Sequence, residues 1–420
     1  MGTKTRLSAM MFGQYFVWGA WWVTLGTYMN AIGFDAIIGT TYSVQGWAAI
    51  ITPLALGVLA DRYLDADKLF ASLHVLGAGV LVFLSTVTDS PGLFFGTALA
   101  YMLLYMPTLP LSNTIAFGAL SDVKREFPAI RVLGTVGWIV AGLIVGFASL
   151  EATNVPILIA AGASLALGAF GLVLPRTPPQ AKAGVRPSVA AGTAGPPEGA
   201  RAVSLGERLG LDVFRAVREP SFWVFIAASL LICVPLAFYY AYTNTFLVEK
   251  GVSGAAAVQS LGQVSEIAFL LALPFFLTRF GIKWVLVVGM TAWAIRYVAF
   301  AYGFEGQAAI LPLLLLGIVL HGVCYDFFFV AGQIYVDEKV APAMRARAQS
   351  FLSLVTLGLG TVIGTNLANA VYVANTVSAD MHEWRTIWLI PAGLSALVAV
   401  AFVLSFHERP VRAGAAVPAE

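Results

Sequence analysis

Long, uninterrupted runs of apolar residues recur along the whole chain. Each run is close to the roughly 20 residues that an α-helix needs to cross the hydrocarbon core of a bilayer. Transmembrane β-strands would instead alternate apolar and polar residues, and the runs show no such alternation. The pattern therefore predicts an all-α membrane protein with twelve spans. The expected spans are 8–30, 37–60, 69–87, 92–118, 131–150, 154–175, 220–246, 254–278, 283–303, 308–335, 345–372 and 385–406.

Composition supports this interpretation. Hydrophobic residues make up 59% of the 420 residues and charged residues only 11%, whereas soluble domains carry about 25% charged residues. The first run is long and aromatic and has no small-residue cleavage site, so we interpret it as a span and not as a signal peptide. The net charge of +2 gives no indication of a nucleic-acid partner. Cys233 and Cys324 both fall in apolar runs, which predicts buried thiols and neither a disulfide framework nor a metal site.

Lysine and arginine residues are distributed unequally between the two ends of the spans. An even number of spans places both termini on one side, and that side carries all but four of the 24 Lys and Arg residues. Lys250 and Arg385 lie on the other side, and Arg131 and Arg296 lie at or within spans. Positive charge concentrates in cytoplasmic loops. The distribution therefore predicts that both termini are cytoplasmic.

A long segment rich in Pro, Gly and Ala divides the spans into six and six. Such a composition is typical of a flexible linker. The two halves share weak sequence similarity. Span five carries Gly142-x-x-x-Gly146, and span eleven carries Gly360-x-x-x-Gly364 at the corresponding place. Two six-span halves predict the major facilitator fold, with two six-helix bundles around a central cavity. The expected domains are the bundle 1–175, the linker 176–219, the bundle 220–410 and the tail 411–420.

The loop after the second span, GVLADRYLDADK at 57–68, resembles the G-x-x-x-D-R loop of major facilitator proteins. Gly57, Asp61 and Arg62 match that motif. The resemblance implies that Asp61 and Arg62 form a gating latch near the cytoplasmic helix ends. The alternative is an ordinary charged hairpin.

Two acidic residues, Glu266 and Asp326, lie inside apolar runs. An ionised carboxylate in hydrocarbon costs several kcal/mol unless it is paired, hydrated or protonated. We therefore expect both acids to line the central cavity as a proton or substrate site. The alternative is a structural ion pair with Arg131, Arg296 or His321.

Other polar and aromatic side chains share faces of the predicted spans. Gln263 lies one turn before Glu266, and His321, Tyr325 and Phe329 recur at four-residue spacing beside Asp326. Each of these residues alone could serve helix packing or interfacial anchoring, and His321 is either a structural group or a proton partner of Asp326. Further candidates are Gln14, Trp18, Trp21, Arg131, Thr135, Trp138, Tyr239, Tyr240, Thr243 and Asn244.

No motif of a soluble enzyme or an ATPase is present. The chain has no Walker loop, no G-x-S-x-G and no H-E-x-x-H. The sequence therefore predicts a protein that is not an enzyme, that needs no cofactor or metal, and that is driven by an ion gradient or by the gradient of its substrate. Carboxylates inside the membrane favour protons as the coupling ion, although Na⁺ could use them with further oxygen ligands.

Several longer strings resemble one family. WGAWWVTLGTYM, YMPTL, FPAIRVLGTVGW, FFLTRFGIKWVL, AWAIRYVAFAYG and YDFFFVAGQIYVDEKVAPAMRARAQ are similar to the nucleoside:proton symporter family of the major facilitator superfamily. The resemblance runs from the first span to the last, the linker excepted. It implies a monomer in the bacterial cell inner membrane that takes up nucleosides with protons by alternating access.

The resemblance also implies roles for individual residues. Substrate contacts are implied for Arg131 and Thr135, Gln263 and Glu266 match a pair on the eighth span, and Asp326 matches an acid on the tenth. Tyr325 holds an aromatic position before that acid, and Trp138 stands where Phe is usual. Proton coupling is implied for Asp326 or Glu266, and Asp326 is the favoured carrier.

Three positions depart from the family pattern. Ala237 and Tyr240 stand where amides are usual, and His321 stands where Tyr is usual. Missing hydrogen-bond partners change selectivity steeply, so these departures leave the substrate open between a nucleoside and another small polar solute such as a sugar or glycoside. A membrane sensor that does not transport is a third alternative.

Overall fold

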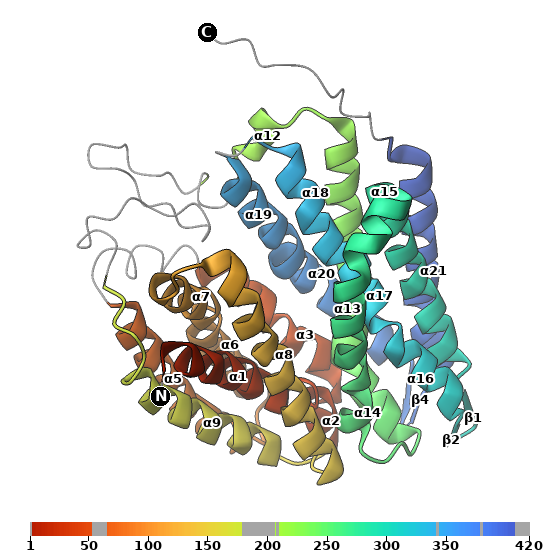
Figure 1. Cartoon of the computed structure of the whole chain (residues 1–420). Coiled ribbons are helices and arrows are strands. Elements are labelled where there is room, and N and C mark those ends of the chain that lie inside the picture. Colours follow the sequence, from red (N-terminus) through yellow and green to blue (C-terminus); the bar gives the residue numbers. More distant parts are fainter. Residues whose placement is uncertain are drawn as a thin grey trace.

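The computed structural model describes residues 2–52, 65–178, 206, 210–341, 344–378 and 381–407, and nearly all of these are helical (Figure 1). The first half contains α1 (Thr3–Trp22), α2 (Leu25–Ala31), the short η1 (Asp35–Ile37), α3 (Ile38–Tyr42), α5 (Ala66–Leu84), α6 (Pro91–Tyr105), α7 (Thr108–Ala119), α8 (Val123–Phe147) and α9 (Val155–Gly171).

The second half contains α12 (Val213–Ala216), α13 (Pro220–Glu249), α14 (Ala255–Gln259), α15 (Leu261–Ala301), α16 (Leu311–Val319), α17 (His321–Tyr325), the π-helical η3 (Asp326–Val330), α18 (Ala331–Lys339), α19 (Arg345–Ser353), the π-helical η5 (Leu354–Gly360), α20 (Thr361–Ala374) and α21 (Trp384–Ser405). Two antiparallel hairpins lie in loops of this half. They are β1 (Phe304–Glu305) with β2 (Ala308–Ala309), and β3 (Thr376–Ser378) with β4 (Met381–His382).

Within the described residues the long helices lie in the predicted spans, of which the second is described only as far as residue 52. Within the described residues, eight helical stretches are long and apolar enough to cross a membrane, and one of them, Ala255–Ala301, contains the predicted spans eight and nine together. The two spans are joined without a loop, because Gly281 changes the chain direction at φ 72° and ψ 166°. That backbone conformation is essentially restricted to glycine.

Among the described spans, the fourth, tenth and eleventh are interrupted, and the tenth and eleventh contribute residues to the cavity described below. Pro107, which has no amide hydrogen, separates α6 from α7 in the fourth span. The tenth and eleventh spans each contain a π-helical segment, η3 and η5. A π-helical turn takes up extra residues and rotates the side chains that follow, and such segments are frequent at functional sites.

The two halves contact each other at one end of the molecule. There α2 and α3 pack against α13, α3 packs against α20, and α8 packs against α14. In Figure 1 the halves diverge toward the opposite end, where α7 and α19 lie. That end also carries the start of α1 and the end of α21, so we call it the terminal end.

The small-residue motifs of spans five and eleven make different contacts. A Cβ at Gly146 would overlap the backbone of Ala257 in α14, so this motif brings the two halves together. A Cβ at Gly364 would instead overlap the Cys233 carbonyl of α13 within the second half. Both glycine motifs therefore allow close helix packing, but the motif of span five packs against the other half and that of span eleven packs within its own half.

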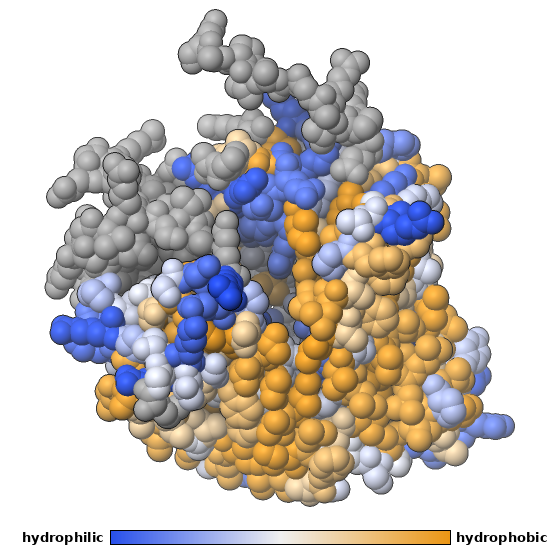
Figure 2. All heavy atoms as spheres, in the orientation of Figure 1, coloured by the Kyte–Doolittle hydropathy of each residue, from blue (hydrophilic) through white to orange (hydrophobic). Residues whose placement is uncertain are grey.

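The outer surface suits a bilayer. Phe147, Leu172, Leu271 and Leu404 are largely exposed, as expected where lipid replaces water. Figure 2 shows hydrophobic residues over α8 and the neighbouring first half of α15, hydrophilic residues at the terminal end, and a hollow between the halves at that end. The thiols of Cys233 and Cys324 are free and buried, as expected for cysteines in apolar runs.

The proposed latch residues Gly57, Asp61 and Arg62 lie outside the described residues, so the latch stays a prediction. The end of the same loop is described. The Asp65 carboxylate lies 2.8 Å from the Lys68 ammonium and 3.4 Å from the Arg176 guanidinium. The hydrogen bond from Lys68, with the charges of Lys68 and Arg176, holds the pKa of Asp65 below its ordinary value. Asp65 thereby connects this loop to the end of the sixth span.

Candidate substrate site

A cavity lies between the two halves and receives side chains from both. The lining residues of the first half are Tyr15, Trp18, Trp22, Tyr42, Gln45, Arg131, Thr135 and Trp138. Those of the second half are Cys233, Leu236, Ala237, Tyr240, Gln263, Glu266, His321, Tyr325, Phe329, Thr356, Leu357, Thr361 and Thr365.

Asp326 is the one predicted substrate-site residue that is not among the lining residues. Its side chain is 1% exposed, and neither carboxylate oxygen has a hydrogen-bond partner in the described part of the chain. Tyr325 and Phe329, four residues apart, face the cavity. Asp326 is the next position around the helix and therefore turns into the second half, where η3 packs against α15 and α18. Of the two acids expected to line the cavity, the structure places Glu266 in its wall and Asp326 behind it.

Arg131 forms part of the wall contributed by α8. Its guanidinium carbon lies 4.2 Å from the centroid of the Tyr15 ring, an attractive cation–π arrangement. Arg131 has no ion pair within 4 Å in the described residues, although it is close enough to interact electrostatically with Glu266 of the other half. The cavity wall therefore contains a cation from one half and an acid from the other, with no ion pair between them.

Glu266 lies beside a buried histidine and a buried arginine. The Glu266 Oε2 atom is 3.8 Å from His321 Nε2, and His321 Nδ1 is 3.3 Å from Arg296 Nη1. Arg296 is fully buried, donates to the Gly317 carbonyl at 2.9 Å, and lies 3.8 Å from the centroid of the Tyr239 ring. Arg296 thus pairs with neither acid among the described residues, so of the three cations considered for a structural ion pair only His321 lies within 4 Å of an acid, Glu266.

Aromatic side chains border the cavity on both halves. Trp138 meets Trp18 edge to face, with ring centroids 5.4 Å apart. On the opposite half, Tyr325 and Phe329 lie 5.3 Å apart, with Tyr240 nearby. Aromatic walls of this kind bury a planar ring, and the polar groups between them orient it.

A second group of polar residues lies on spans two and eleven and was not predicted. Thr356, Thr361 and Thr365 donate their hydroxyl hydrogens to carbonyls of their own helix, which leaves hydroxyl lone pairs free to accept. The Gln45 amide has no hydrogen-bond partner within the described residues. Because η5 places Thr356 and Thr361 five residues apart on one face, a search at the helical period of 3.6 misses the group. Gln45 was detectable as an amide in an apolar run.

Other sequence candidates lie away from the cavity. Gln14 donates to Thr108 at 2.6 Å and bonds His74 at 2.9 Å, which makes both Gln14 and His74 structural groups. Trp21 is fully buried in the first half, and Asn244 bonds across the halves.

Comparison with known proteins identifies the family. The family model of the nucleoside H⁺ symporters matches residues 1–410. The chain belongs to this family. The chain is 41% identical over 421 residues to YegT of Escherichia coli (strain K12), covering 97% of this chain and 95% of the relative. It is 35% identical over 422 residues to the xanthosine permease of the same organism, covering 97% of this chain and 96% of that protein.

Solved structures agree with this assignment. A crystal structure of the nucleoside transporter NupG superposes with a TM-score of 0.84 at 33% identity, covering 97% of this chain and 100% of that chain. The peptide transporter PepTSo superposes with a TM-score of 0.70 at 12% identity, covering 96% of this chain and 97% of that chain, which shows the fold alone. The predicted major facilitator fold, the predicted family and the prediction of a transporter that is not an enzyme are confirmed.

Hydrogen bonds between the halves close the transporter at the end away from the termini. Thr27 donates to Asn244 at 2.7 Å. The Gly39 N–H reaches the Tyr242 hydroxyl at 3.1 Å and the Asn369 side-chain oxygen at 2.8 Å. Further bonds join Thr40 to Asn366, Asn369 to the Ala36 carbonyl, and the Ala256 N–H to Glu151. We call these contacts the gate.

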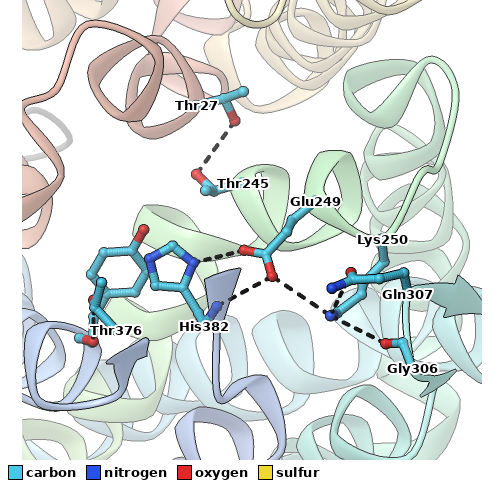
Figure 3. A network of polar contacts seen from close by, with 9 residues as sticks. Thr27, Thr245, Glu249, Lys250, Gly306, Gln307, Thr376 and His382 are labelled. Carbon is cyan, nitrogen blue, oxygen red and sulfur yellow. Dashed lines mark hydrogen bonds and ion pairs between the residues drawn. The ribbon is translucent and has the colours of Figure 1, made fainter. Parts of the chain in front are cut away.

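A charged cluster fixes the end of α13 behind the gate (Figure 3). The Glu249 carboxylate lies 2.7 Å from His382 Nδ1 and 3.5 Å from the Lys250 ammonium. Lys250 in turn donates to the Gln307 side chain and the Gly306 carbonyl. One turn earlier, Thr245 faces Thr27 of the first half at 3.3 Å (Figure 3). The cluster ties two hairpin loops to the helix that carries the gate residues Tyr242 and Asn244.

Proposed function

We propose that this transporter imports nucleosides with protons across the bacterial inner membrane by alternating access. The observation that carries the proposal is the cavity between the halves, in which aromatic faces surround the polar groups of Arg131, Gln263 and Glu266. Membership of the nucleoside H⁺ symporter family supports both the substrate class and the coupling ion.

The cavity suggests how a nucleoside binds. A base ring stacks against Trp138 of one half and Tyr325 or Phe329 of the other. Arg131, Thr135 and Gln263 then supply hydrogen bonds. No hydrogen bond of the Gln263 side chain to the described residues competes with a ligand, so binding need not break an existing contact. The contacts from both halves would couple substrate binding to closure of the cavity.

The two acids are proposed to have different roles. Glu266 lies in the cavity wall and binds substrate, whereas Asp326 is buried without a hydrogen-bond partner among the described residues. An ionised carboxylate in that setting carries a large desolvation cost, and a bound proton removes the charge. We therefore assign the transported proton to Asp326.

The orientation follows from the charge distribution. If both termini are cytoplasmic, as the excess of Lys and Arg on that side predicts, the closed gate is on the outer side. The structure then corresponds to the inward-facing state. Transport requires the gate bonds to break while the terminal ends of the halves approach each other.

The gate assignment predicts the effect of Asn369→Ala. Asn369 bonds Gly39, Tyr242 and Ala36, so its truncation removes bonds across the closed gate. The bonds to Gly39 and Ala36 cross the gate, whereas Tyr242 belongs to the same half as Asn369. Each net hydrogen bond contributes about 1 kcal/mol, so losing the two bonds should raise the outward-open population roughly thirtyfold. A cysteine replacing Gln45, in a chain lacking Cys233 and Cys324, should then react faster with an impermeant maleimide added outside.

A matched control is Asn375→Ala, because the Asn375 side chain bonds only the Val371 carbonyl of its own helix among the described residues. It should leave the labelling rate unchanged. Equal labelling rates of the Asn369 and Asn375 variants would contradict the assignment of these bonds to a closed gate.

The proposed function is tested in proteoliposomes. Labelled uridine and xanthosine should accumulate under an inward proton gradient and leave when a protonophore collapses it. Competition by sugars or glycosides, with none by nucleosides, would favour the alternative solute. Absence of flux for every solute would favour a sensor.

A further inference from the structure

His321 lies between a fixed cation and the cavity acid. Its Nδ1 atom is 3.3 Å from Arg296 Nη1, and its Nε2 atom is 3.8 Å from Glu266 Oε2. The imidazole also stacks on Tyr239, with ring centroids 4.9 Å apart, and the rings of Tyr240 and Tyr325 are its other titratable neighbours. The Asp326 carboxylate forms no hydrogen bond with His321, so the sequence-based hypothesis of a proton partner for Asp326 finds no support.

The arginine determines which nitrogen of His321 carries hydrogen. A guanidinium has five N–H donors and no acceptor. The contact between Arg296 and His321 can therefore be a hydrogen bond only if Nδ1 is unprotonated and accepts. A neutral imidazole with a bare Nδ1 carries its hydrogen on Nε2, and that nitrogen faces Glu266.

Arg296 is held in place by contacts that do not involve the cavity. Its Nε donates to the Gly317 carbonyl, and its planar group lies over the Tyr239 ring. The side chain is 0% exposed, so it cannot turn to solvent. Arg296 thus fixes the tautomer of His321 from the side away from the cavity. The ring presents one donor, Nε2–H, toward Glu266.

We infer that His321 is a positioning residue, a neutral Nε2–H donor oriented by Arg296 that holds the Glu266 carboxylate toward the substrate. The inference rests on the proposed binding role of Glu266. The present distance of 3.8 Å between His321 Nε2 and Glu266 Oε2 is longer than a hydrogen bond, and a displacement of roughly 1 Å would bring the two atoms within hydrogen-bond distance. Such contacts often tighten only when substrate binds. A tyrosine hydroxyl at this position would also be a neutral donor.

The tautomer can be measured without any transport assay. The chain has four histidines, so ¹⁵N-labelled protein in nanodiscs allows the His321 signals to be assigned by comparison with a His321→Tyr sample. The expected result is a neutral ring with hydrogen on Nε2 across the physiological pH range. An imidazolium, or hydrogen on Nδ1, would overturn the inference even if nucleoside transport were established.

The positioning role is tested with three variants in binding and uptake assays. His321→Tyr and His321→Gln keep a neutral donor and should retain uridine affinity within about threefold. His321→Phe preserves ring packing against Tyr239 but has no donor, and its affinity should fall about tenfold. Equal affinity of the Phe and Tyr variants would reduce His321 to a packing residue and overturn the inference.

The same variants separate positioning from proton transport. His321→Tyr should still accumulate substrate in response to a proton gradient, because the proton is not carried on His321. Loss of accumulation with retained exchange in this variant would assign the proton to His321 and overturn the inference. Failure of the wild-type protein to move any nucleoside would instead refute the proposed function and leave the tautomer measurement standing.

Discussion

Replacement of Asp326 by asparagine should abolish the accumulation of nucleoside against its gradient. The introduced amide has nearly the shape of a protonated aspartate but cannot release a proton, so the variant resembles the proton-loaded carrier permanently. Exchange of labelled for unlabelled substrate across the membrane should persist, because exchange needs no net proton movement. The measurement compares the concentration ratio of labelled uridine, with and without an inward proton gradient, with the rate of exchange at equal pH.

An aspartate outside the cavity provides the control. Asp89 is exposed in a loop, so Asp89→Asn should leave both accumulation and exchange intact. If Asp326→Asn still concentrated uridine in response to the proton gradient, the coupling role would belong to Glu266 or to another ion. Glu266→Gln, by contrast, should act mainly on binding.

Truncation of Gln263 to alanine should weaken nucleoside binding by about 1–3 kcal/mol, the usual cost of leaving a buried polar partner unpaired. The amide lies in the cavity wall one turn before Glu266, and its side chain makes no hydrogen bond to the described protein residues. Removing it therefore disturbs the ligand contact and little else. Binding of uridine and of other nucleosides, measured by calorimetry on purified protein, checks the loss.

The matched control is Gln349→Ala. Gln349 is a glutamine whose side chain bonds the Gln333 carbonyl away from the cavity, and its truncation should leave affinity unchanged. Unaltered affinity of Gln263→Ala for every nucleoside tested would remove Gln263 from the binding site. Comparison with Gln45→Ala would then show whether the polar group on spans two and eleven binds substrate instead.

The sequence by itself determined the class of protein and its fold, and it singled out two acids, Glu266 and Asp326, as candidates for the site. These conclusions depend on local properties, namely the length of an apolar run and the cost of a charge inside it. Motif resemblance added the family and pointed to Arg131, Thr135, Trp138 and Gln263, all of which line the cavity. Polar residues of this kind are detectable because a polar side chain inside an apolar span costs free energy and is therefore rare unless it has a function.

Only the tertiary structure decided which of these side chains share one cavity. Asp326, the next position around the helix from the cavity residue Tyr325, turns away from the cavity, while the π-helical η5 places Thr356 and Thr361 on one face that lines it. The Arg296–His321–Glu266 arrangement joins three spans whose relative rotation no local pattern encodes. Helix rotation is set by packing between segments far apart in the chain, and close approaches such as Gly146 against Ala257 fix it.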